Sequence, residues 1–297
     1  MTTMKSASSA NAVAASMRVE PTSGPLGADV VGVDFGLKLT DKEVRLIEKA
    51  WHDHLVLRFR GQALTDEQLM AFSAYLGTLD PAPLGSANPT ERDQTGFVTI
   101  ISNVVVDGRS IGALGSYESL WHSDMSYNER PPIGSLLHAL EVPPAGGDTG
   151  FANMYLAYEK LPPALKEQAD RLTCIHDASR NSAGELRKGY QEVTDLRATP
   201  GAVHPLVITH PATQRRALYL GRRKNAYIPG LEIATSEALL DKLWAHATRS
   251  EFTWYQKWRL GDLVMWDNRC TLHRRDAFDA ASRRLMHRTQ ITGAAIA

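Results

Sequence analysis

The sequence predicts a mainly β protein with flanking helices, folded as a jelly roll. Short runs of β-branched and aromatic residues recur along the chain between turn residues, which is typical of an antiparallel sandwich. Only a few helical segments interrupt these runs, and two of them begin with a capping box. The 297 residues contain no repeat and no dividing linker, so we expect one domain over residues 17–297. Residues 1–16, rich in Ala, Ser, Thr and Asn, are expected to form a disordered tail.

The first part of the chain combines a hairpin with two helices. Residues 17–35 alternate and turn, which predicts a short hairpin. A capping box that starts at Thr40 opens a helix, and residues 54–59 then form a buried strand. A second capping box starts at Thr65, and its helix ends at Gly77. The apolar stripes of both helices are expected to pack in the core.

The rest of the chain alternates strands with three further helices. The expected strands are residues 97–101, 104–106, 134–140, 203–209, 217–220, 263–266 and 285–291. The expected helices are residues 154–161, 163–172 and 236–247, the last of them capped by Ser236.

Composition and charge restrict the partners. Lys plus Arg and Asp plus Glu both number 33, so no global field is available to hold a polyanion. We therefore expect a small-molecule partner rather than nucleic acid, and no apolar run approaches the roughly 18 residues of a membrane span. The two cysteines, Cys174 and Cys270, form no C-x-x-C pair, which favours a reducing compartment. We expect a cytoplasmic homo-oligomer.

His122, Asp124 and His273 are the candidates for metal binding. In a strand, residues i and i+2 point to the same face, so His122 and Asp124 can present an imidazole and a carboxylate to one metal. Taken alone, this motif is weak, and a His–Asp surface pair is the simpler explanation of it. His273, which follows an apolar strand and a polar turn, adds a second imidazole. Such a set leaves three positions open, which suits iron(II) with a bidentate co-substrate and O2, whereas structural zinc takes four protein ligands.

Arg284 and Arg288 are the candidates for anion binding. Arg284 directly precedes the strand expected at residues 285–291, and Arg288 lies within it. Both would share one face of the strand with Met286. Two guanidiniums directed into a barrel are costly to bury unless an anion pairs with them, and carboxylates match their forked geometry. A solvated basic patch near the C-terminus is the alternative.

In combination, these motifs resemble the taurine and 2,4-dichlorophenoxyacetate dioxygenases, which depend on iron(II) and 2-oxoglutarate. The resemblance covers about residues 19–293. It is carried, in order, by Trp121-His122-Ser123-Asp124, Pro131-Pro132, Gly146-Gly147-Asp148-Thr149, His204-Pro205-Leu206-Val207, Thr209-His210-Pro211, Trp266-Asp267-Asn268, His273, Arg284 and Arg288. The implied fold is a double-stranded β-helix, a cupin-like jelly roll with helices on its outer face.

The resemblance also implies roles for the matched residues. It makes His122, Asp124 and His273 the iron ligands, and it assigns Thr149 and Arg284 to the distal carboxylate of 2-oxoglutarate. It places Arg288 nearer the metal, against an anionic substrate or the co-substrate. Tyr117, Glu118, Met125, Tyr127 and Tyr219 are expected to line the substrate pocket. The implied reaction hydroxylates, and can thereby cleave, a small anionic substrate while 2-oxoglutarate is decarboxylated to succinate and CO2.

Two other classes of protein stay open at this point. A metal-dependent hydrolase on a jelly roll could use the same three ligands, but it would need neither Thr149 nor the arginines and would work without O2. A non-catalytic jelly-roll binding module would not consume 2-oxoglutarate. Within the family, Ala82 or a neighbour stands where taurine enzymes use a sulfonate-binding histidine, which argues against taurine. Residues 177–192 either close as a lid or face solvent.

Overall fold

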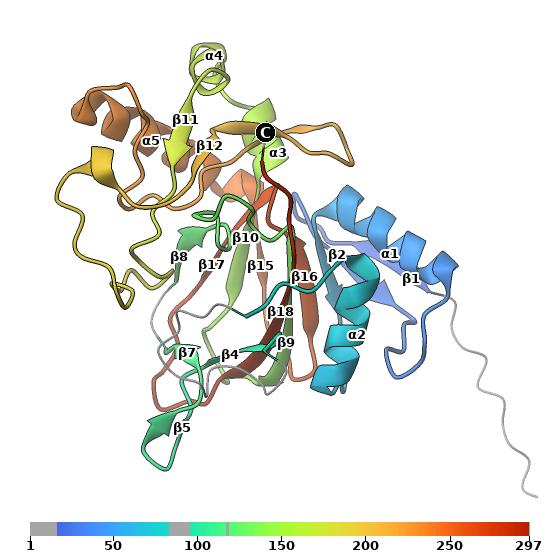
Figure 1. The fold of residues 1–297 in the computed structure, drawn as a ribbon. Coiled ribbons are helices and arrows are strands. Elements are labelled where there is room, and N and C mark those ends of the chain that lie inside the picture. The colour runs from blue at the N-terminus through green and yellow to red at the C-terminus, as the bar shows by residue number, and fades with distance from the viewer. Residues whose placement is uncertain (1–16, 83–95, 117–118, 297) are drawn as a thin grey trace, which may run out of the picture.

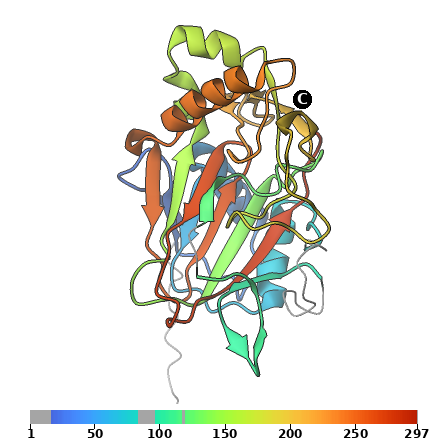
Figure 2. The ribbon, with the colours of Figure 1, turned by 90° about the vertical axis from the view of Figure 1, so that its left-hand side faces the viewer.

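Two antiparallel-rich sheets share one core in the computed structural model of the chain, which describes residues 17–82, 96–116 and 119–296 (Figures 1 and 2). The larger sheet has the strand order β1 (Arg18–Pro21), β2 (Ala28–Val31), β3 (Val56–Phe59), β16 (Leu263–Asp267), β9 (Gly134–Glu141), β18 (Leu285–Ile291), β4 (Thr99–Ser102) and β7 (Ala113–Leu114). The smaller sheet has the order β15 (Thr253–Gln256), β10 (Thr149–Asn153), β17 (Thr271–Arg275) and β8 (Ser119–His122).

The main core lies between these two sheets. Phe151 and Leu272 of the smaller sheet are buried in one cluster with Val264, Trp266 and Met286 of the larger sheet. β16 and β10 are buried at every residue, and in β16 this explains why Leu263–Trp266 is a continuous apolar run rather than an alternating one. The predicted strands at residues 263–266 and 285–291 are therefore confirmed.

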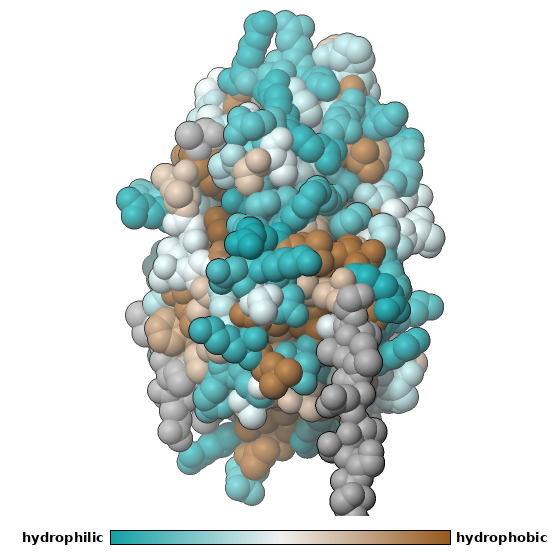
Figure 3. All heavy atoms as spheres, turned by 90° about the vertical axis from the view of Figure 1, so that its right-hand side faces the viewer, coloured by the Kyte–Doolittle hydropathy of each residue, from teal (hydrophilic) through white to brown (hydrophobic). Residues whose placement is uncertain are grey.

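Two helices pack against the outer face of the larger sheet (Figure 1). Both capping boxes are confirmed: Thr40 opens α1 (Asp41–His54), and Thr65 opens α2 (Asp66–Leu76). Their apolar faces form a second cluster that includes Ile47 and Phe72. Figure 3 shows the side of the molecule that carries these helices, where hydrophobic side chains gather in separate areas between hydrophilic ones.

Three more helices gather at one end of the sheets, together with two short strand pairs (Figure 1). The helices are α3 (Met154–Glu159), α4 (Pro163–Ala169) and α5 (Ile233–Ala247). The pairs are β11 (Thr173–Ile175) with β12 (Val203–Pro205), and β13 (Val207–Thr209) with β14 (Arg216–Leu218); a further hairpin, β5 (Val105–Val106) with β6 (Arg109–Ser110), lies elsewhere. Within the described ranges, no helix has the length and apolar character to cross a membrane.

Several expected boundaries are wrong, each for a local reason. The strand expected at residues 203–209 is two strands, because the pairing partner changes at Leu206, whose backbone N–H donates to Leu172 while its carbonyl accepts from Tyr219. Ser236 is not a cap, since α5 begins at Ile233 and the buried Ser236 hydroxyl instead accepts from the backbone of Ile228 at 2.9 Å. The expected strand at residues 54–59 begins two residues late because α1 continues through His54. The expected N-terminal tail lies outside the described residues.

Candidate active site

Three buried side chains, His122, Asp124 and His273, converge between the two sheets. His122 ends β8 and is paired in register with His273 of β17, so their ring centroids are 4.1 Å apart. Asp124 Oδ1 lies 3.6 Å from His122 Nε2 and 3.7 Å from His273 Nε2. One ligand atom from each residue therefore lies within 4.8 Å of the others. A divalent metal could contact all three atoms at ordinary ligand distances.

Asp124 reaches this point from a turn and not from a strand. β8 ends at His122, so the expected i, i+2 arrangement on one strand face is wrong. The turn is fixed from outside the strand, because Ser123 donates its backbone N–H to Gly221 and its hydroxyl to Asn268. Asp124 Oδ2 accepts from the Ser135 hydroxyl at 2.7 Å, which leaves Oδ1 directed at the two imidazoles.

The protonation of the three side chains suits metal binding. His122 Nδ1 lies 2.7 Å from the Leu120 carbonyl oxygen, so Nδ1 carries the proton and the Nε2 lone pair is free. Burial lowers the pKa of His122 and, more strongly, that of His273, so both rings are neutral as ligands must be. Burial alone would raise the pKa of Asp124, but Arg288 and the two histidines hold it well below its usual range.

A cavity of about 50 Å³ adjoins the triad and is lined by four arginines, Arg274, Arg275, Arg284 and Arg288. Arg284 is 2% exposed, and among the described residues its Nε has no hydrogen-bond partner and its guanidinium no carboxylate. Burial, with repulsion from Arg275, lowers the pKa of Arg284 to about 9. Thr149 lines the same cavity, and its hydroxyl accepts from Trp258 Nε1 at 2.9 Å, which leaves its own proton free for an acceptor. An anion would satisfy both groups.

The sequence patterns pointed neither to Arg275, which lines this cavity, nor to Trp258, which contacts two of its lining residues. Arg275 follows His273 by two positions on β17, and this i, i+2 spacing is the signal that could have found it. Trp258 bonds Thr149 and also lies under the Arg284 guanidinium, at 5.9 Å from ring centroid to carbon. No sequence pattern connects Trp258 to either partner, because 109 positions separate it from Thr149.

The structure places the expected substrate-pocket residues differently. Tyr117 and Glu118 lie outside the described residues. Met125 follows Asp124 in the turn, with a positive φ of 46°, and it is not among the residues that line the triad cavity. Tyr219 is not among the residues that line the triad cavity; it lines a separate cavity of about 240 Å³, and its ring centroid lies 5.2 Å from that of His176.

A second cluster of His210, Asp267 and Cys270 has the composition of a metal site but not the free ligand atoms. His210 Nδ1 accepts from the backbone N–H groups of Ala212 and Thr213, and Nε2 lies 3.0 Å from Asp267 Oδ2. Because both ring nitrogens are engaged, we assign this cluster to structure rather than to metal binding.

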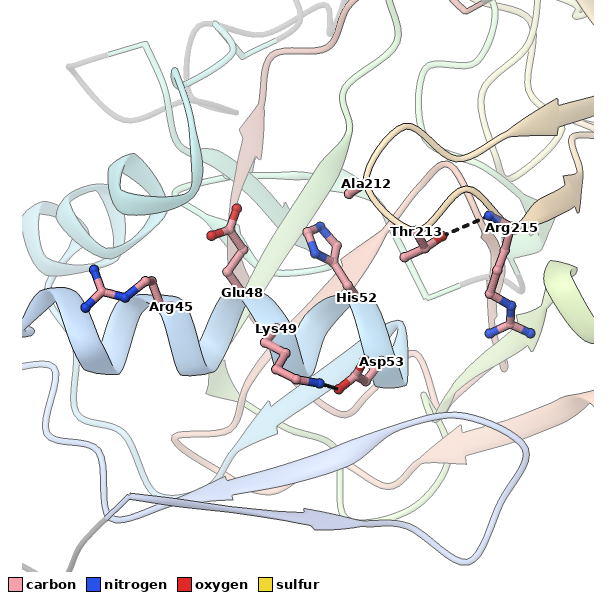
Figure 4. A pocket seen from close by; sticks show the side chains of 8 residues that line it. All are labelled: Arg45, Glu48, Lys49, His52, Asp53, Ala212, Thr213 and Arg215. Carbon is pink, nitrogen blue, oxygen red and sulfur yellow. Dashed lines mark hydrogen bonds and ion pairs between the residues drawn. The ribbon is translucent and has the colours of Figure 1, made fainter.

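A surface groove of about 750 Å³ lies near this second cluster. Figure 4 shows its lining by Arg45, Glu48, Lys49, His52, Asp53, Ala212, Thr213 and Arg215. Several of these charges are satisfied within the chain, since Lys49 pairs with Asp53 at 2.5 Å and Arg215 pairs with Glu159 at 2.7 Å. The groove therefore offers little unmatched charge to a ligand.

Comparison with known proteins identifies the family. Residues 18–290 match the family model described as taurine catabolism dioxygenase TauD, TfdA family. The chain belongs to the TauD/TfdA family.

Relatives and solved structures of the TauD/TfdA family are similar to this chain over most of its length. The 2,4-dichlorophenoxyacetate dioxygenase of Cupriavidus pinatubonensis is 37% identical over 88% of this chain and 92% of its own. The sulfate ester dioxygenase of Pseudomonas putida is 33% identical over 86% of this chain and 82% of its own. A taurine dioxygenase structure from Burkholderia xenovorans, 34% identical, superposes with a TM-score of 0.77 over 95% of this chain and 91% of that one.

As a TauD/TfdA member, the chain is an iron(II)- and 2-oxoglutarate-dependent dioxygenase of small molecules. The residues present fit these cofactors. Two neutral imidazoles and a carboxylate are a ligand set for non-haem iron(II). The unmatched guanidinium of Arg284 and the free hydroxyl proton of Thr149 fit a carboxylate.

His176 gives this region a predicted acid sensitivity. It is fully buried, and burial, with repulsion from His204, lowers its pKa to about 3. Below pH 6.5, His176 is protonated in the unfolded chain but stays neutral in the folded chain. The stability that the neutral, buried His176 contributes is therefore fully present above pH 6.5 and is lost as pH falls toward 3. The free energy of unfolding should fall by up to about 1.4 kcal/mol per pH unit from this group alone.

The measurement is urea unfolding of the wild type and His176→Leu between pH 6.5 and 4.5. The variant should show the shallower dependence on pH, whatever its overall stability. Equal slopes for the two proteins would mean that His176 titrates normally.

Proposed function

We propose that the chain hydroxylates small anionic molecules, with His122, Asp124 and His273 as the iron(II) ligands and Thr149 and Arg284 as the holders of 2-oxoglutarate. The observation that carries this proposal is the buried guanidinium of Arg284, which has no carboxylate among the described residues and lies in the same cavity as the triad histidines. A metal-dependent hydrolase would have no use for such a group beside its metal.

The positions of these residues suggest a separate role for the metal, for the co-substrate ligands and for the apolar wall of the site. Iron(II), when bound, supplies the redox chemistry that couples decarboxylation of 2-oxoglutarate to oxidation of a C–H bond. Arg284 and Thr149 orient the co-substrate by its distal carboxylate. Trp266 and Phe151 pack against the His273 ring, at centroid distances of 4.9 and 6.2 Å, and keep that side of the site dry. No general acid or base is required from the protein.

We propose that Arg288 contacts the substrate beside the metal, because it lines the triad cavity. Its charge is partly engaged, since Nη1 donates to Asp124 Oδ1 at 3.1 Å. Arg288 therefore has a counter-charge within the chain, and the expectation that only a bound anion would pair with it is wrong. Because Arg288 already donates to Asp124, we propose that a second guanidinium neutralises the acidic group of the substrate.

Three broader features belong to the same proposal. We infer that the two sheets form a double-stranded β-helix and that residues 17–297 are one domain. We also propose that the protein works in the cytoplasm as a homo-oligomer. The free and buried state of Cys174 and Cys270 supports a reducing compartment. The substrates in the names of the relatives, 2,4-dichlorophenoxyacetate and sulfate esters, are anions, which supports an anionic substrate here.

Succinate formation tests the proposed function directly. Protein loaded with iron(II) should convert 2-oxoglutarate to succinate in air, and one or more of a panel of aryloxyalkanoates, sulfonates and sulfate esters should stimulate the rate. The same panel should give no product without O2. Product formed without O2 would indicate a hydrolase, and no consumption of 2-oxoglutarate under any condition would indicate a binding module.

A further inference from the structure

A chamber of about 360 Å³ adjoins the triad cavity on the side of β8. We call it the outer chamber. His122 and Ser182 line both spaces, which places the outer chamber next to the metal ligands. Leu120, Trp121 and Trp244 give it apolar walls. Its volume and its lining are those of a site for a small organic molecule.

Arg222 lines this chamber, and its backbone is fixed to the triad. It forms an antiparallel bridge with His122, and the preceding carbonyl, of Gly221, accepts from Ser123 at 3.0 Å. Gly221 has a positive φ of 65°, and a Cβ there would lie 2.2 Å from His176 Nδ1. The loop therefore approaches the core too closely to shift freely, and Arg222 keeps its place relative to the metal ligands.

The guanidinium of Arg222 has no anionic partner among the described residues. Nη1 donates to the carbonyl of Arg180, the group lies 5.5 Å from the centre of the Tyr127 ring, and the buried Nε has no hydrogen-bond partner. On the same ring, 4.5 Å from its centre, lies the Arg187 guanidinium, which adds to the positive charge. Burial lowers the pKa of Arg222, as expected for a cation without a counter-ion.

The other charged groups of the outer chamber are already matched. Arg180 pairs with Glu192, and Arg223 is held by Glu237 at 3.0 Å and by Asp241 at 2.7 Å. The chamber's carboxylate, Asp177, accepts from the backbone of Ser179 and from Asn225 at 3.0 Å. Lys224 is exposed to solvent. Within the described residues, Arg222 is thus the buried guanidinium of this chamber that forms no ion pair, and the more distant Asp124 and Asp177 offset its charge only in part.

We propose that the outer chamber binds a carboxylate monoanion with an apolar, ring-sized body, and that Arg222 binds its carboxylate. The forked guanidinium matches a carboxylate, and the tryptophan and leucine walls match the apolar body. This inference rests on the proposed function and specifies its substrate class. It also separates two tasks: Arg222 binds the acidic group of the substrate, while Arg288 holds Asp124 and faces the substrate beside the metal.

Phenoxyacetate and its neutral analogue phenoxyacetamide test this inference by calorimetric titration. The protein is loaded with Mn(II) and N-oxalylglycine, an unreactive mimic of 2-oxoglutarate, so that binding is measured without turnover. The wild type should bind phenoxyacetate at least about tenfold more tightly than the amide, since a charge-assisted pair is lost with the amide. Arg222→Met should bind both compounds equally, with its affinity for N-oxalylglycine unchanged.

Two further variants separate binding from folding. Arg223→Met removes a cation from the same loop that Glu237 and Asp241 already hold, and it should keep the preference for phenoxyacetate. Arg222→Lys should recover only part of that preference, because lysine keeps the charge but lacks the planar fork.

The inference fails if wild-type protein does not bind phenoxyacetate or does not prefer it to the amide. It also fails if Arg222→Met retains the preference, or if Arg288→Met removes it while Arg222→Met does not. In the last case the acid binds at Arg288 and the proposed function still stands. Failure of the proposed function is distinguishable, because the wild type would then bind no N-oxalylglycine and form no succinate.

Discussion

Asp124→Ala is expected to abolish turnover and the weak visible absorption band that iron(II) and 2-oxoglutarate should give together in the absence of O2. Asp124 supplies the carboxylate of the three-residue cluster, and its Oδ1 lies within 3.7 Å of both imidazoles. Without it, two neutral rings hold a divalent cation in a buried site. The affinity for iron(II) should fall by more than about 100-fold, since even the partners of metal ligands contribute 10–100-fold.

The matched control for this variant is Ser135→Ala. Ser135 donates to Asp124 Oδ2 at 2.7 Å and accepts from Asn268 and Gln290 at 3.1 Å, so the variant leaves the metal ligand in place and removes the hydroxyl that supports it. We expect a weakened but measurable band, with at most about a 100-fold loss of iron affinity. An unchanged band in Asp124→Ala would remove this residue from the metal site. Zinc should inhibit the wild type, because it can occupy the ligands but cannot carry out the redox chemistry.

Arg284→Ala should raise the 2-oxoglutarate requirement steeply while iron(II) binding stays nearly intact. The guanidinium is almost fully buried, and no described carboxylate competes for it. Loss of a desolvated carboxylate contact costs on the order of 2–5 kcal/mol, which is more than tenfold in affinity. Thr149→Val should cost less, about 1 kcal/mol, because it removes one neutral donor. The readout is the 2-oxoglutarate dependence of succinate formation, with iron affinity measured separately.

Arg283→Ala is the neighbouring control. Arg283 is exposed and pairs with Glu141 at 2.6 Å on the surface, so its loss should leave the co-substrate requirement within about twofold of wild type. Normal 2-oxoglutarate affinity in Arg284→Ala would place the co-substrate elsewhere. Equal defects in Arg283→Ala and Arg284→Ala would indicate a general loss of positive charge rather than a specific contact.

Local sequence patterns predicted those helices and strands whose structure depends on contacts within the same segment. The capping boxes at Thr40 and Thr65 each satisfy their own backbone groups, so no distant contact was needed to foresee α1 and α2. The single strand predicted at residues 203–209 was wrong because its division depends on distant segments. Leu206 bonds to Leu172 on one side and to Tyr219 on the other, so the pairing partner changes there. A pattern of apolar residues does not record which strand will become the neighbour.

The same distinction applies to the candidate site. His122, Asp124 and His273 were found because their residue types are unusual at such spacing and because the family resemblance joins them. The turn that carries Asp124 could not be foreseen, since Gly221 and Asn268 fix it from far along the chain. Arg222 gave no signal in a run of basic residues. Only folding shows that its neighbour Arg223 has carboxylate partners and that Arg222 has none.

The groups proposed for oxidation and those proposed for selecting the substrate come from different parts of the fold. The triad histidines and Thr149 are on strands of the smaller sheet, and Arg284 adjoins β18 of the larger one, so their separations depend on the shared core. The walls of the outer chamber come largely from residues 177–184, residues 222–224 and the end of α5, which all lie outside those sheets. Grafting side chains of these segments from a relative, with Gly221, Ser182 and the backbone bridge to His122 kept, should therefore change which compound is accepted while the reaction is retained, which is a starting point for building new oxidation catalysts.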